Sequence, residues 1–146
     1  MVFRSRRDQY FSIMMAIVIV VIAAVTLLPI LFDKSATLGT VLFMVGLFLF
    51  TTAFLLWIIF SIKYVFEDDH LFVKGGPFRS RIPYDEITLV TRATDILVGY
   101  RILTSKDALE IFYQRGLLGS IKISPRDQEA FLKELKKRCP HAEFRM

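Results

Sequence analysis

The first part of the chain contains two long runs without a formal charge, separated by a very short corner. Residues 9–32, between Asp8 and Asp33, form the first run, and residues 35–62, between Lys34 and Lys63, form the second. A helix needs about 20 apolar residues to cross the roughly 30 Å hydrocarbon core of a bilayer. Both runs are long enough, so the sequence predicts a transmembrane hairpin over 1–62, with spans at about 10–32 and 36–62, and a small domain over 63–146.

The first run has the basic flank of a signal peptide, because Arg4, Arg6 and Arg7 precede it. It is much longer than the roughly 7–15 apolar residues of a signal sequence, and no A-x-A cleavage pattern follows it. We therefore expect an uncleaved span.

Positive charge flanks the outer ends of the hairpin and avoids its corner, where Lys34 stands beside Asp33. The cations that follow the second run are Lys63, Lys74, Arg79 and Arg81. Because cytoplasmic flanks carry the excess of Lys and Arg, we expect a multi-pass protein of the plasma membrane with both termini in the cytoplasm.

Aromatic residues stand at the same outer ends, where amphipathic rings prefer the membrane interface. They are Tyr10, Phe11, Trp57 and Tyr64. Neither run contains an ionisable residue, whereas transporters, channels and proton paths need buried charge or a polar pore lining. The hairpin is therefore interpreted as an anchor in the lipid bilayer.

From residue 63 the pattern changes to short β-prone segments separated by turns. Strands are predicted over 64–66, 71–74, 78–82, 87–91, 109–113 and 120–123. The apolar stretch 96–103 fits either a buried strand or a helical turn.

A helix with clear boundary signals ends the chain. Ser124 is predicted as its N-cap and Pro125 as its first residue, with Phe131, Leu132 and Leu135 forming the buried stripe. The fold class is thus α+β, with a two-helix transmembrane hairpin followed by an antiparallel β-barrel or sandwich that a C-terminal helix caps.

Three stretches in this order resemble the YyaB-like bacterial PH domain family. They are FVKGGPFRSRIPYDEI at 72–87, LEIFY at 109–113 and ISPRDQEAFL at 123–132, and the resemblance covers most of 64–135. It implies a membrane-anchored protein in which two transmembrane helices precede a pleckstrin-homology-like barrel. The resemblance assigns no activity.

No catalytic, cofactor or metal-binding motif is recognisable, so we expect neither an enzyme nor a cofactor. Cys139 is the single cysteine, which excludes a disulfide framework and a multi-cysteine metal site. Its neighbours Lys136 and Arg138 are of the kind that lower a thiol pKa, and we expect it to react with thiol reagents after cell lysis. Asp68, Asp69 and His70 are interpreted as a solvated turn rather than a metal site. The net charge of +5 is small and spread out, so no nucleic-acid partner is expected.

The remaining candidate site consists of Lys74, Arg79 and Arg81 around the Gly75–Gly76 turn. Arg79 and Arg81 share one strand face because the side-chain period is two. The three cations form either an anion-binding patch for lipid headgroups or an acidic partner, or an ordinary solvated face. The preceding turn, 67–70, is acidic, which argues against phosphoinositide binding in the eukaryotic manner.

Two functional hypotheses follow. The first is a non-enzymatic membrane-anchored interaction or scaffold module that binds a partner protein, a second copy of itself or the membrane surface. The alternative is a membrane-associated self-protection protein of the bacteriocin-immunity kind.

Overall fold

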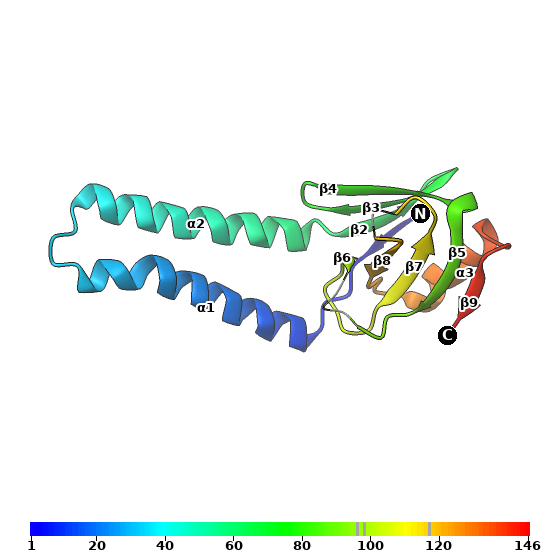
Figure 1. Ribbon diagram of the computed structural model, residues 1–146, viewed down its shortest axis with the longest axis horizontal. Coiled ribbons are helices and arrows are strands. Elements are labelled where there is room, and N and C mark those ends of the chain that lie inside the picture. The colour runs from blue at the N-terminus through cyan, green and yellow to red at the C-terminus, as the bar shows by residue number, and fades with distance from the viewer. Residues whose placement is uncertain (96, 98, 117) are drawn as a thin grey trace.

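A computed structural model describes residues 1–95, 97, 99–116 and 118–146. Two long helices run side by side away from a β-rich domain (Figure 1). These are α1 (Gln9–Phe32) and α2 (Leu38–Phe60), which Asp8 and Thr37 cap at their N-termini. Within the described residues, both are long and apolar enough to cross a membrane. Their apolar side chains are largely exposed, because the helices pack only against each other along most of their length.

The residues before α1 belong to the domain rather than to the hairpin. Val2–Arg4 form strand β1, which pairs antiparallel with β2 (Lys63–Phe66), so that Val2 lies opposite Val65. The prediction that all of 1–62 belongs to the hairpin therefore does not hold for 2–4, because three alternating residues are too few for a strand pattern to be recognised. The hairpin is thus inserted between two neighbouring strands of one sheet.

The strands of the described residues form a four-stranded and a five-stranded sheet, here called the N-terminal and C-terminal sheets. The N-terminal sheet has the order β1, β2, β3 (His70–Gly75) and β4 (Phe78–Pro83). The C-terminal sheet has the order β6 (Tyr100–Ile102), β8 (Ser120–Ile123), β7 (Leu109–Tyr113), β5 (Ile87–Arg92) and β9 (Glu143–Arg145). The 3₁₀ turn η1 (Tyr84–Glu86) connects the two sheets.

The two sheets form a sandwich rather than a closed barrel. Neighbouring strands are antiparallel apart from β5 with β9 and β6 with β8, which are parallel. The predicted strands are all present, and the ambiguous stretch 96–103 contributes β6. Ile96 and Val98 lie outside the described residues.

The core lies between the sheets and is closed by α3 (Gln128–Arg138), which inserts Phe131 and Leu135. Tyr64, expected at the membrane interface, is instead fully buried in this core. Its hydroxyl donates to the Ile102 carbonyl at 2.6 Å and accepts from the Ser124 N–H at 3.1 Å. A buried tyrosine needs such partners, and the strand alternation of β2 directs this one inward.

The start of α3 differs from the prediction. Asp127 is the N-cap and accepts from the Ala130 N–H at 3.0 Å. Ser124 is buried instead, and its hydroxyl accepts from the Thr104 N–H at 2.9 Å. The chain stays extended for longer because Pro125 forms a β-bridge with Ser5, a partner from the far end of the sequence.

Candidate anion-binding surface

A row of cations crosses the outer face of the N-terminal sheet. Lys74 of β3 lies directly opposite Arg79 of β4 on one side and Lys63 of β2 on the other. Lys63 in turn lies opposite Arg4 of β1. Directly opposed residues of paired strands share a face. We call Arg4, Lys63, Lys74 and Arg79 the cation row.

The row lies at the end of the sheet where the hairpin joins the domain. Lys63 begins β2 shortly after α2 ends at Phe60. The turn after β3 contacts the same helix: a Cβ added to Gly76 would lie 2.7 Å from the Ile58 Cγ1 atom and 3.0 Å from its Cα. Gly76 also has a φ of +58°, which favours glycine. The close approach of Gly76 to Ile58 therefore places the cation row beside the last turns of α2.

The three residues predicted as one site line two separate hollows. Lys74 lines a hollow of about 280 Å³ together with Arg4, Lys63 and residues 60–62. Arg79 and Arg81 line a different groove of about 470 Å³, which we call the β4 groove. Its other lining residues are Ser80, Pro83, Glu86, Tyr100, Tyr113, Arg115 and Leu118. The structure therefore brings Lys74 and Arg79 together across the strands but does not gather the three predicted residues into one pocket.

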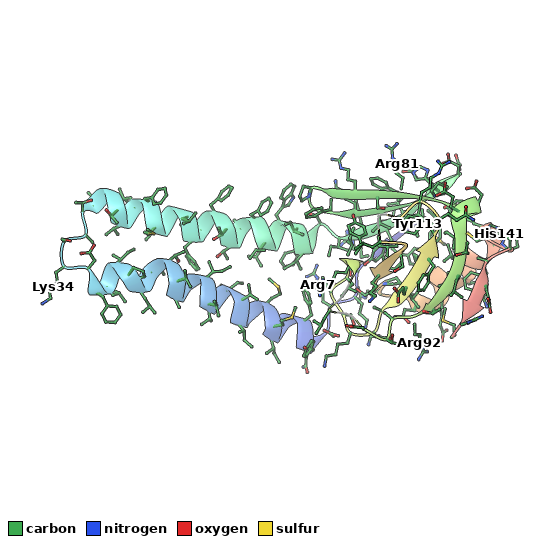
Figure 2. The ribbon with its side chains drawn as sticks, viewed as in Figure 1. Arg7, Lys34, Arg81, Arg92, Tyr113 and His141 are labelled. Carbon is green, nitrogen blue, oxygen red and sulfur yellow. The ribbon has the colours of Figure 1, made fainter. Side chains whose placement is uncertain are left out.

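The β4 groove carries an excess of positive charge. Its carboxylate, Glu86, pairs with Arg115 at 3.1 Å between Oε1 and Nε. Arg79 and Arg81 have no carboxylate within salt-bridge distance among the described residues. Figure 2 shows Arg81 on the outer side of β4 and Tyr113 on the neighbouring sheet.

The acidic turn between β2 and β3 lies at the opposite end of β3 from the cation row. Its residues pair locally, with the His70 Nδ1 atom 2.5 Å from an oxygen of Asp69. The pKa of Asp69 is lowered chiefly by this hydrogen bond, and the charge of Arg81 contributes to a smaller extent. Within the described residues, no group of three or more His, Cys, Asp or Glu side chains is placed to hold a metal ion.

Cys139 is not the accessible thiol that its basic neighbours suggested. It is fully buried as part of the core, and burial raises the pKa of its thiol to about 11 despite the opposing effect of Arg138. The prediction of a reactive thiol is wrong because the last turn of α3 directs this side chain inward, whereas Lys136 is exposed.

The comparisons with known proteins agree with this architecture. Residues 62–139, more than half of the chain, match the bacterial PH domain family. The chain belongs to this family. It is also 30% identical over 138 residues to the uncharacterized protein YyaB of Bacillus subtilis (strain 168), covering 94% of this chain and 92% of that protein. The similarity to YyaB therefore includes both long helices as well as the PH domain, which confirms the YyaB-like resemblance. No solved structure matches the chain.

Sequence reasoning missed several residues of this surface. Arg4 and Lys63 were interpreted only as topology signals, and their place in the row depends on the pairing of β1 with β2. Arg115, Tyr100 and Tyr113 reach the β4 groove from the other sheet, and no local pattern marks them.

Proposed function

We propose that this PH-domain protein is a non-enzymatic module, anchored in the membrane by α1 and α2, that holds an acidic protein partner at the cytoplasmic surface through the β4 groove. The observation that carries the proposal is the position of Arg79 and Arg81 together on the edge strand β4, where they line a groove with a third arginine, Arg115.

Exposed apolar surface supports the membrane anchor. The side chains of both long helices are apolar and largely exposed, including Phe50 at 70% and Leu31 at 78%. A water-soluble protein does not normally expose such a continuous surface, whereas lipid accepts it. Because β1 precedes α1 and pairs with β2 after α2, both ends of the hairpin lie on one side. The flanking cations favour the cytoplasmic side.

The chemistry of the β4 groove supports a protein partner. Arginine and tyrosine are enriched at the energetic centres of protein interfaces, and the groove offers Arg79, Arg81, Tyr100 and Tyr113. Among the described strands, β4 is outermost in its sheet, so one edge presents backbone N–H and C=O groups that an extended segment can pair with. An acidic extended segment satisfies both the backbone edge and the arginines.

The membrane tether makes modest affinity sufficient. Confining the domain and its partner to one surface raises their effective concentration, so that even weak contacts give stable association. The absence of a recognisable catalytic motif in the sequence supports a binding role, as does membership of the PH domain family. The self-protection alternative stays a hypothesis, since neither the comparisons nor the described residues add to it.

Crosslinking in native membranes tests the proposal. The double variant Arg79→Glu and Arg81→Glu is compared with wild type and with Lys133→Glu and Lys136→Glu, which reverse two charges on the exposed face of α3. We expect the groove variant to lose a crosslinked partner that the wild type and the α3 variant retain. If a folded groove variant keeps all native crosslinks, or if the lost product is a homodimer, the proposal of an acidic protein partner is wrong.

A further inference from the structure

We propose that Arg4, Lys63 and Lys74 form a binding site for the phosphate group of an anionic phospholipid, at the point where α2 joins the domain. This site is separate from the β4 groove and does not depend on the protein partner proposed above.

The first argument is the register of three adjacent strands. Arg4 lies opposite Lys63, and Lys63 lies opposite Lys74. Like charges directly opposite each other destabilise a sheet, so three cations in consecutive register repel one another, and an anion bound among them would relieve that repulsion. The arrangement is therefore more easily explained by a bound anion than by a solvated face alone.

The second argument is the lack of an internal counter-charge. Among the residues that the structure describes, none of the three cations has a carboxylate within salt-bridge distance. Other surface cations of this domain do pair, such as Arg6 with Asp107 at 2.9 Å. The three cations are exposed or half-buried, so their charged groups remain available to a ligand.

The third argument is the shape of the site. The three cations line a hollow of about 280 Å³ whose other lining residues are Phe60, Ser61 and Ile62. Its wall is thus partly apolar and partly charged, as suits a lipid headgroup that continues into a glycerol backbone. Ser61 does not donate into the hollow, because its hydroxyl donates to the Trp57 carbonyl at 2.6 Å.

The fourth argument is the depth of the hollow relative to the membrane. Phe60 is the last residue of α2, the second candidate span. The guanidinium of Arg7, two residues before α1 begins at Gln9, lies over the Phe60 ring at 4.2 Å from its centroid. Figure 2 shows Arg7 where the hairpin meets the domain. When α2 spans the bilayer, the hollow therefore opens at the level of the headgroup phosphates, where basic pockets bind anionic lipids.

The depth of the site favours a lipid over a dissolved phosphate, because the headgroups of the membrane supply phosphate groups at this level at high local concentration. A phosphate accepts charge-assisted hydrogen bonds from several cations at once, which relieves their mutual repulsion.

Native mass spectrometry of the full-length protein tests this site. The protein is purified in a mild detergent and supplied with either phosphatidylglycerol or zwitterionic phosphatidylcholine. We expect wild type to retain phosphatidylglycerol preferentially. The Lys63→Gln and Lys74→Gln double variant should retain roughly 25-fold less phosphatidylglycerol than wild type, since each cation near an anionic surface contributes roughly fivefold to the affinity.

The matched control is Lys133→Gln with Lys136→Gln, which removes the same charge from α3 and should retain lipid as wild type does. If the double variant fails to fold, Arg4→Gln alone provides the comparison, with a loss of roughly fivefold expected.

Unchanged phosphatidylglycerol retention in a folded variant would overturn the proposal. Equal retention of the two lipids by wild type, together with binding of inorganic phosphate that the double variant loses, would overturn the lipid assignment and show a site for free phosphate. Loss of lipid without loss of the partner crosslink separates this site from the β4 groove.

Discussion

Phe3, which precedes the first long helix, packs edge-on against Phe131 of the last helix, with 5.4 Å between ring centroids and 82° between ring planes. The same ring lies 5.6 Å from that of Phe66 in β2. The PH domain therefore encloses both ends of the hairpin. It is not an appendage attached only after α2.

Phe3→Ala should destabilise the protein measurably, although Phe3 stands in the basic flank that the sequence assigns to the hairpin. Replacing a fully buried Phe by Ala lowers the free energy of unfolding by about 3–5 kcal/mol. Because Phe3 is only half-buried, we expect Phe3→Ala to lower it by about 2 kcal/mol. Val2→Ala is the control, because Val2 is 60% exposed. Thermal unfolding of the full chain in detergent measures both, and equal midpoints would show that β1 does not pack in this way.

Phe131→Ala should remove the centre of the helix–sheet contact. Phe131 is fully buried and contacts Tyr64, Phe66 and Phe3, so we expect a loss of about 3–5 kcal/mol. Lys133→Ala, on the exposed side of α3, should be nearly neutral. The full chain is the appropriate sample, because a fragment beginning at Lys63 lacks β1. A Phe131→Ala variant as stable as Lys133→Ala would contradict the position of α3.

Gly76→Ala tests the contact between the domain and α2. The variant combines left-handed backbone strain of about 1 kcal/mol with a steric clash against Ile58, which should add about 1–3 kcal/mol. Gly119→Ala isolates the strain, since Gly119 has a φ of +75° and no atom within 4 Å of an added Cβ. Chemical unfolding of the two variants should therefore differ by the clash alone. Equal losses would place the β3–β4 turn away from α2.

Asp8→Asn should reduce stability at neutral pH and much less in acid. Partial burial alone raises the pKa of Asp8, but hydrogen bonds from the Lys106 N–H, the Phe11 N–H and the Ser105 hydroxyl together hold it below its usual range. A lowered pKa in the folded state contributes stability above the unfolded value, about pH 4, and this contribution is lost as pH falls through the folded pKa.

The amide of the Asp8→Asn variant keeps one acceptor, so the loss at pH 7 should be about 1–2 kcal/mol. Urea unfolding at pH 7 and pH 3 measures the difference between wild type and variant. Asp68→Asn, in the exposed acidic turn, serves as the control and should change little. A difference that grows on acidification would contradict the assigned role of Asp8.

Local patterns predicted most of the elements, and long-range pairing decided what they missed. The charge-free runs, the alternating strands and the Phe131–Leu135 stripe follow from residue periodicity alone. Ser124 is predicted as a helix cap because it directly precedes Pro125 and the helical pattern. In the folded chain its hydroxyl is instead hydrogen-bonded with Ser5 and Thr104. The sequence did not mark Arg4 and Arg115 for the candidate surface for the same reason, because they join their neighbours only through contacts between distant segments.

Cysteine accessibility in intact bacterial cells tests the central claim, that α1 and α2 cross the membrane and leave the PH domain in the cytoplasm. Ser35→Cys places a thiol in the exposed corner between the helices, and Lys133→Cys places one on the exposed face of α3. The native Cys139 is buried, with its pKa raised to about 11, so wild type provides a low background. A membrane-impermeant thiol reagent should label Ser35→Cys in intact cells and Lys133→Cys only after lysis. Labelling of Lys133→Cys in intact cells, or of neither variant until lysis, would contradict this topology.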